Sequence, residues 1–119
     1  MGRSILVVDD ETAVTLALEA FFRSRGYEVL RAFYGAEALK RIEQDRPTVA
    51  VVDLYMPGMN GIAVLEKVRE QFPEVKTLVI TGYADKYRSD LERLKPDALQ
   101  LKPVSLEQLV NTVENLMNK

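Results

Sequence analysis

The sequence predicts an α/β protein in which a doubly wound, five-stranded parallel sheet is flanked by five helices. Short runs of β-branched residues alternate with longer segments of helical periodicity, which is typical of parallel strands joined by right-handed helical crossovers. Three of the runs are wholly or mostly apolar, as in strands covered on both faces. The length of 119 residues suits a single domain, 1–119.

The five expected strands are short and differ in polarity. They span residues 5–8, 28–31, 49–52, 77–80 and 99–101. The second and last are more mixed than the others, so we expect them nearer the edges of the sheet.

Apolar spacing and turn residues bound the five expected helices. The first carries Val14, Ala17, Leu18, Phe21 and Phe22 and stops at Gly26; the second opens near Gly35, carries Leu39 and Ile42 and ends before Pro47; the third runs from Asn60-Gly61 to before Pro73; the fourth carries Tyr87, Leu91 and Leu94. The fourth has the weakest signal because it is short and highly charged. The fifth opens with a capping box, Ser105 to Gln108.

Composition excludes many kinds of chemistry. The chain has no cysteine and no histidine, which excludes disulfides, thiolate zinc sites and imidazole general bases. A net charge of −2 argues against nucleic-acid binding through the overall field. No apolar run approaches the roughly 20 residues of a membrane span, and the N-terminus is not of signal-peptide type. We therefore expect a soluble, cytoplasmic protein that makes no membrane contact.

Polar side chains follow four of the five strands. They are Asp9 and Asp10 after the first, Asp53 after the third, Thr81 after the fourth and Lys102 after the fifth. Each has a simple structural explanation, such as a helix cap, a turn or a solvated lysine. Carboxyl ends of parallel strands meet at one edge of the sheet, however, and clustered carboxylates there repel one another unless a cation lies among them.

The absence of histidine and cysteine favours a hard cation at this edge. Mg²⁺ commonly takes one or two carboxylates together with phosphate oxygens, so Asp9 or Asp10, Asp53 and one backbone carbonyl would suffice. A carboxylate beside Mg²⁺ can attack phosphorus and form an acyl phosphate. Lys102 would help to neutralise the phosphoryl oxygens, Thr81 would donate a hydrogen bond, and Gly82 would leave room.

Four motifs in this order resemble the receiver domain of two-component response regulators over essentially the whole chain. They are ILVVDDE (Ile5 to Glu11), VVDLYMPGMNG (Val51 to Gly61), VITG (Val79 to Gly82) and LKP (Leu101 to Pro103). The resemblance implies a flavodoxin-like sheet of strand order 2-1-3-4-5. It also implies a phosphorylation-dependent switch without a dedicated small-molecule substrate, rather than an enzyme in the usual sense.

The resemblance further implies residue roles and partners. Asp53 would be the phosphoacceptor; Asp9, Asp10, Asp53 and the Tyr55 carbonyl would bind Mg²⁺; Thr81 and Lys102 would contact the phosphoryl group. The Lys102–Pro103 peptide is often cis in this family. The donor would be a sensor histidine kinase or a histidine phosphotransfer protein. The fourth helix, fifth strand and fifth helix would face an output domain, a downstream protein or, in a phosphorylation-dependent dimer, a second copy.

Two features depart from the family pattern or modulate it. Leu99 occupies a position that is usually aromatic; we expect an ordinary core leucine, with signalling relying more on Thr81, the loop from Tyr83 and the short fourth helix. Tyr55 and Tyr83 flank the expected site, and their rings could slow the attack of water on the acyl phosphate.

Three other functions stay open from the residues alone. A flavodoxin-type electron carrier would need a hydroxyl-rich loop where this chain has acidic residues. A carboxylate-based phosphatase would need Asp-x-Asp after the first strand. A pseudo-receiver would act only as a protein-interaction domain, and the intact acidic set, Thr81 and Lys102 speak against it.

Overall fold

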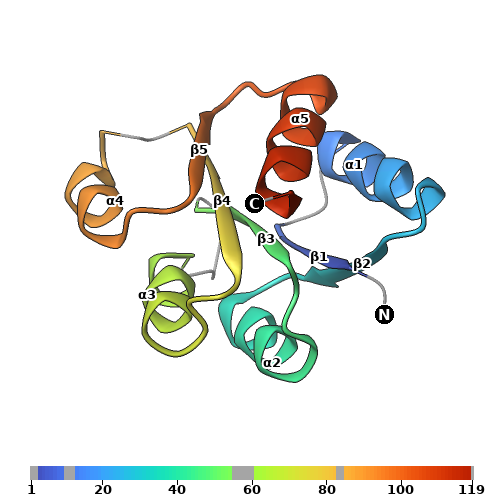
Figure 1. The fold of residues 1–119 in the computed structure, drawn as a ribbon. Coiled ribbons are helices and arrows are strands. Elements are labelled where there is room, and N and C mark those ends of the chain that lie inside the picture. Colours follow the sequence, from blue (N-terminus) through green and yellow to red (C-terminus); the bar gives the residue numbers. More distant parts are fainter. Residues whose placement is uncertain (1–2, 10–12, 55–60, 83–84, 119) are drawn as a thin grey trace.

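The computed structural model describes residues 3–9, 13–54, 61–82 and 85–118. Five parallel strands form one sheet in the order β2-β1-β3-β4-β5, seen almost edge-on in Figure 1. The strands are β1 (Ser4–Val8), β2 (Glu28–Ala32), β3 (Val49–Asp53), β4 (Lys76–Thr81) and β5 (Ala98–Leu101). The predicted fold class and strand order are confirmed, and the two mixed strands are the edge strands.

Helices cover both faces of this sheet, as the doubly wound prediction requires. They are α1 (Ala13–Ser24), α2 (Gly35–Asp45), α3 (Gly61–Gln71), α4 (Arg88–Leu94) and α5 (Leu106–Met117). In Figure 1, α1 and α5 lie on one side of the sheet, and α2 and α3 lie on the other. Tyr87, which the sequence placed inside the fourth helix, is instead the residue before α4, and its side chain packs partly buried against the core.

The core consists of two apolar layers, one on each face of the sheet. Alternate residues of the central strands enter opposite layers: Val7 and Val51 pack with α1 and α5, whereas Leu6 and Val52 pack with α2, α3 and α4. Full burial of such a side chain contributes about 1.5–3 kcal/mol. This two-sided burial explains why the central strands are apolar without alternation.

Two helix-boundary signals behave as the sequence predicts. Gly26 follows α1 with φ of 89°, a left-handed conformation that glycine adopts without strain. At α5, Ser105 accepts a hydrogen bond from the Gln108 backbone N–H, and the Gln108 side chain accepts one from the Ser105 N–H.

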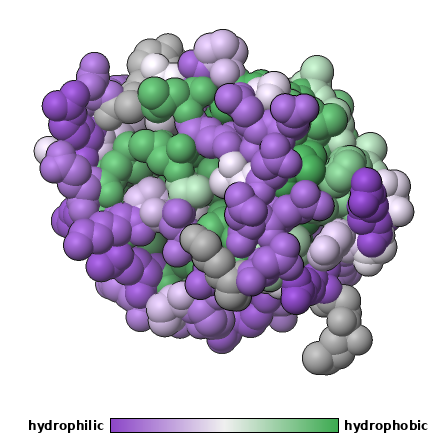
Figure 2. Space-filling model, turned by 45° about the horizontal axis from the view of Figure 1, so that its top comes forward, coloured by the Kyte–Doolittle hydropathy of each residue, from purple (hydrophilic) through white to green (hydrophobic). Residues whose placement is uncertain are grey.

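Leu99 does not lie in the core, so that expectation was wrong. It is 44% exposed, and Leu101 on the same face of β5 is 57% exposed. The reason is that β5 is an edge strand whose neighbouring helix, α4, has only seven residues. An open groove of about 380 Å³, lined by Leu91 and Leu99 among others, separates α4 from β5. Figure 2 shows hydrophobic surface between the hydrophilic side chains of α4 and α5.

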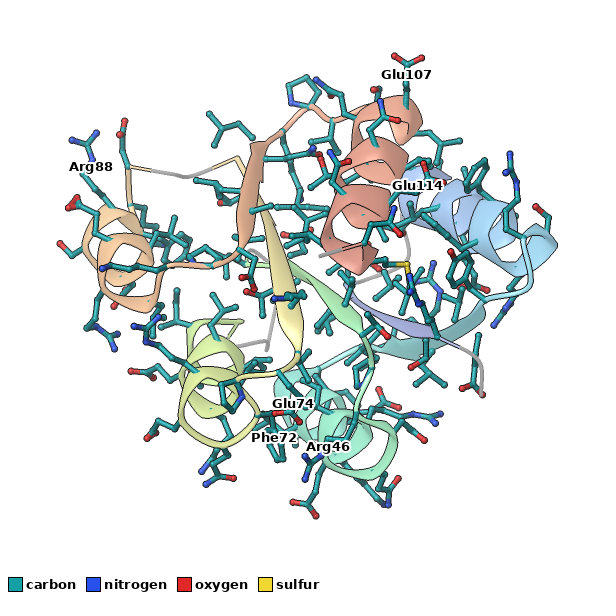
Figure 3. All side chains as sticks on the ribbon, in the orientation of Figure 1. Arg46, Phe72, Glu74, Arg88, Glu107 and Glu114 are labelled. Carbon is teal, nitrogen blue, oxygen red and sulfur yellow. The ribbon has the colours of Figure 1, made fainter. Side chains whose placement is uncertain are left out.

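Contacts of Arg46 with Phe72 and Glu74 connect the end of α2 to the segment that precedes β4. Arg46 ends α2 with a left-handed backbone conformation. Its guanidinium lies 4.5 Å from the centre of the Phe72 ring and 2.9 Å from a carboxylate oxygen of Glu74. Figure 3 shows the three side chains together below the sheet.

Within the described residues, no helix has both the length and the apolar character needed to cross a bilayer.

Candidate functional site

The register of the sheet brings the first and third strand ends together. Val8 pairs with Val52 in adjacent parallel strands, so the next residues, Asp9 and Asp53, stand side by side, and neighbouring strands lie about 4.8 Å apart. Both side chains lie on the face that α1 and α5 cover, because each is two residues beyond a residue of that layer. Asp9 is 2% exposed and Asp53 is 4% exposed. Two carboxylates are therefore buried next to each other.

Lys102 provides a positive charge to this pair. Its Nζ lies 2.7 Å from Oδ2 of Asp53, a contact across 49 residues of sequence. The backbone N–H of Lys102 also donates to the carbonyl of Thr81 at 3.0 Å, which fixes the start of the β5–α5 loop against β4. The following Lys102–Pro103 peptide is cis, as the family resemblance implies.

The two carboxylates and the lysine line one open groove. It has a volume of about 450 Å³, and its other walls come from α1 (Val14 and Thr15), the end of β4 (Ile80) and the β5–α5 loop (Pro103 and Val104). Most of its lining surface is apolar, and its charged side chains are those of Asp9, Asp53 and Lys102. Electrostatic interactions are stronger beside apolar walls than in open water, so the groove suits a charged group that must bind tightly.

Thr81 is the last residue of β4, and Gly82 follows it. Thr81 is fully buried, and the strand alternation places its side chain on the face covered by α3 and α4, opposite to Asp53. A Cβ atom added to Gly82 would lie 3.7 Å from the Lys102 Cβ, which is an ordinary van der Waals distance. The described structure thus joins Asp9, Asp53 and Lys102 in the groove, with Thr81 beside them at the same edge.

Gly61, the first residue of α3, lies unusually close to the end of β3. A Cβ atom at this position would be 2.8 Å from Cδ2 of Leu54 and 3.4 Å from the carbonyl oxygen of Asp53. Only glycine permits this approach without a shift. The contact brings the first residue of α3 against the backbone of Asp53 and Leu54.

Arg31 belongs to the site, although the sequence analysis missed it. Its Nη1 lies 3.1 Å from Oδ1 of Asp9, and its Nε pairs with Glu19 of α1. An arginine in a short strand that neighbours an acidic strand end is the signal that could have revealed it. The signal is weak because the pairing of β1 with β2 had to be known first.

The carboxylate set fits a hard divalent cation. Asp9 and Asp53 provide buried oxygen ligands on one groove, and oxygen ligands are those that Mg²⁺ prefers. Within residues 3–9, 13–54, 61–82 and 85–118, no group of three His, Cys, Asp or Glu side chains is arranged to hold a metal ion. Asp10, Tyr55 and Tyr83, which the sequence also singled out, lie outside the described residues.

A family model decides the classification. Residues 5–114 match the model of the response regulator receiver domain. The chain belongs to this family. Receiver domains are signalling domains of two-component systems rather than classical enzymes, and they act with histidine kinases or phosphotransfer proteins and with output domains.

Curated relatives of this receiver domain include bacterial signalling proteins. It is 34% identical over 119 residues to the sensor kinase CckA of Brucella abortus, covering 98% of this chain and 13% of that protein. It is 31% identical over 120 residues to the alkaline phosphatase synthesis regulator PhoP of Bacillus subtilis, covering all of this chain and 50% of PhoP. The chain thus spans half or less of the length of these two relatives.

Solved structures confirm the receiver fold. A CheY-like receiver domain protein of Methanospirillum hungatei superposes with a TM-score of 0.88 at 30% identity, covering 99% of this chain and 95% of that one. The response regulator TrrA of Thermotoga maritima, solved in complex with Mg²⁺–BeF, gives 0.79 at 32% identity over 96% and 98% of the two chains. These comparisons give no support to a flavodoxin-type carrier or a pseudo-receiver.

Proposed function

We propose that Asp53 of this receiver domain accepts a phosphoryl group from a phosphohistidine of a sensor histidine kinase or a histidine phosphotransfer protein. The observation that carries the proposal is the 2.7 Å contact between Lys102 Nζ and a buried Asp53 carboxylate, in a groove that also contains Asp9. The contact with Lys102 orients the buried Asp53 carboxylate, which lines an open groove. The carboxylate is therefore positioned to attack an incoming phosphorus atom.

The transfer exchanges one bond to phosphorus for another. A carboxylate oxygen of Asp53 forms a bond to phosphorus while the bond from phosphorus to the donor imidazole nitrogen breaks. The electron pair leaves with the imidazole, which then takes up a proton. Lys102 stays beside Asp53 and pairs with one phosphoryl oxygen. The Thr81 hydroxyl donates a hydrogen bond to a second phosphoryl oxygen. Later attack by water releases inorganic phosphate and restores the carboxylate.

Mg²⁺ is the expected cofactor of this step. Asp9, Asp10, Asp53 and the backbone carbonyl of Tyr55 would hold it, and the solved Mg²⁺–BeF complex of the Thermotoga relative supports Mg²⁺ as the ion. The ion would neutralise negative charge on the phosphoryl oxygens, which is where phosphoryl transfer gains most of its help.

The consequence of phosphorylation is proposed to be a change at the α4–β5–α5 face. Thr81 and Leu99 lie on the same side of the sheet at adjacent strands, so a movement of Thr81 towards a phosphoryl group reaches the exposed surface through β5 and α4. This face would bind an output domain, a downstream protein or a second copy. We further propose that residues 1–119 form one receiver domain and that it functions in the cytoplasm.

Intact-mass measurement after incubation with acetyl phosphate and Mg²⁺ tests the phosphoacceptor. We expect one phosphoryl addition to the parent protein and none to Asp53→Asn, because asparagine lacks the nucleophilic carboxylate oxygen. The exposed Asp85→Asn makes the same change in charge away from the groove and should keep the addition. Labelling of Asp53→Asn at the parent level, or no labelling of the parent protein, would refute the proposal.

A further inference from the structure

Arg31 is a second cation beside the groove carboxylates, because it pairs with Asp9, and the proposed chemistry does not use it. Its side chain is only 12% exposed, and it lies between Oδ1 of Asp9, at 3.1 Å, and the carboxylate of Glu19 on α1. Asp9 and Glu19 are themselves 3% and 14% exposed at their side chains. The guanidinium is thus shared by an expected metal ligand and a helix residue.

The position of Arg31 follows from the strand register. Arg31 pairs with Val7 in adjacent strands, so it stands on the same face as Asp9, which follows the end of β1 two residues after Val7. Buried charges persist when they are paired, and Asp9 and Asp53 place two negative charges at neighbouring strand ends. Arg31 therefore compensates Asp9 in the same way that Lys102 compensates Asp53.

A divalent cation at the groove would change this balance. Asp9 would help to hold the ion, and a fixed positive charge beside the same carboxylate opposes cation binding. Glu19 acts in the opposite direction, because it accepts from Arg31 Nε and so draws part of the guanidinium charge away from Asp9.

We infer that Arg31 is a positioning residue that sets the Mg²⁺ affinity of this domain: it holds the Asp9 carboxylate in the metal-free state and weakens Mg²⁺ binding, and Glu19 on α1 moderates this effect. The inference rests on the proposed Mg²⁺ site and deepens it. It also gives α1 a route to the site, since a displacement of Glu19 alters the charge that Asp9 experiences.

Calorimetric titration with MgCl₂ tests this inference without any phosphoryl donor. Arg31→Gln should lower the Mg²⁺ Kd about ten-fold, the order expected when a unit charge a few ångströms away is removed from a partly buried site. Glu19→Gln should raise the Kd roughly two- to three-fold, because Arg31 then pairs with Asp9 alone. Arg41→Gln removes a charge from an exposed pair on α2 and should leave the Kd unchanged.

The opposite signs separate this role from a purely structural one, which would weaken Mg²⁺ binding in both variants. A Kd for Arg31→Gln that is unchanged or higher overturns the inference, as does a shift of both variants in the same direction. Failure of the parent chain to bind Mg²⁺ would instead refute the proposed metal site. Thermal melting gives a second readout: Arg31→Gln should melt lower than the parent in EDTA and gain more from added Mg²⁺. If Arg31→Gln does not fold, Arg31→Met, which also removes the charge but keeps a flexible apolar stem, replaces it in both measurements, and an unchanged or higher Kd for that variant overturns the inference.

Discussion

At the scale of single residues, ion pairs in this domain differ mainly in burial. The carboxylates of Asp9 and Asp53 are almost wholly buried, whereas pairs such as Arg88 with Asp85 are exposed at both ends. Exposed pairs contribute about 0–1 kcal/mol. Removing one partner from a buried pair costs more, because it leaves an uncompensated charge away from water. The two buried carboxylates therefore depend on Lys102 and Arg31.

Glu74 illustrates an exposed pair with a predictable pH response. The backbone N–H of Glu74 and the Arg46 side chain both donate hydrogen bonds to the Glu74 carboxylate, and these bonds hold its pKa below the usual value of 4.5. Because the folded-state pKa is lowered, the pair stabilises the fold above the unfolded-state pKa, and this contribution is lost as the pH falls through the folded-state value.

Substitution of Glu74 by glutamine should reduce stability at neutral pH but not in strong acid. We expect the difference in urea midpoint between parent and Glu74→Gln to be present at neutral pH and to vanish once the pH is well below 4.5. Glu70→Gln, at an exposed position of α3, is the control. A difference that stays constant across the acid range would contradict the assignment.

At the scale of secondary-structure elements, the start of α3 determines how Asp53 is presented. The helix begins at Gly61, whose backbone approaches Leu54 and the Asp53 carbonyl more closely than a residue with a Cβ could. Leu54 is 3% exposed and packs in the core, so it has little room to give way. Because protein interiors are close-packed, a shift of Leu54 would be transmitted to the residues around it.

Gly61→Ala should therefore destabilise the domain by about 1–2 kcal/mol, despite the better helix propensity of alanine, because the added methyl overpacks the β3–α3 junction. Urea unfolding measures the change. Gly82→Ala is a matched control at another strand end, since its Cβ would meet Lys102 only at ordinary contact distance, and its unfolding should shift by less than about 0.5 kcal/mol. Equal stability of Gly61→Ala and the parent would show that α3 can move away from the strand.

At the scale of the whole molecule, helices cover both faces of the sheet, but the β5 edge is partly exposed. The short α4 leaves Leu99 and Leu101 exposed. Charged residues of α4 line the groove beside Leu99, among them Arg88, which projects outward from α4 in Figure 3. An apolar strip with a charged border is typical of a protein-interaction surface, and it coincides with the face proposed to carry the output.

Leu99→Asp tests the proposed phosphorylation-dependent dimerisation through this face. We expect the phosphorylated parent to dimerise in sedimentation velocity experiments and phosphorylated Leu99→Asp to stay monomeric, because a carboxylate in the apolar strip would have to be desolvated in the interface. Leu16→Asp has the same 44% exposure on α1 and should still dimerise. Stability of Leu99→Asp should be within about 0.5 kcal/mol of the parent. A dimer that survives the Leu99 substitution would place the interface elsewhere.

Much of this architecture could be predicted from the sequence because its signals are local. Apolar runs, Gly26 and the capping box at Ser105 depend on neighbours in the chain, and the structure confirms each of them. Asp9, Asp53, Thr81 and Lys102 could be assigned to one edge because the carboxyl ends of parallel strands coincide. The chain order of the motifs then sufficed to indicate the family.

Other features depend on which elements become neighbours, and only the tertiary structure decided them. The exposure of Leu99 follows from its place on an edge strand beside a short helix, and an apolar residue in a strand pattern carries no sign of that. The contact of Arg31 with Asp9 and Glu19 requires β2, β1 and α1 to meet. The sequence by itself thus determined the fold class and the family. The packing of distant segments determined which side chains compensate the buried charges, because charge compensation depends on distance in space rather than along the chain.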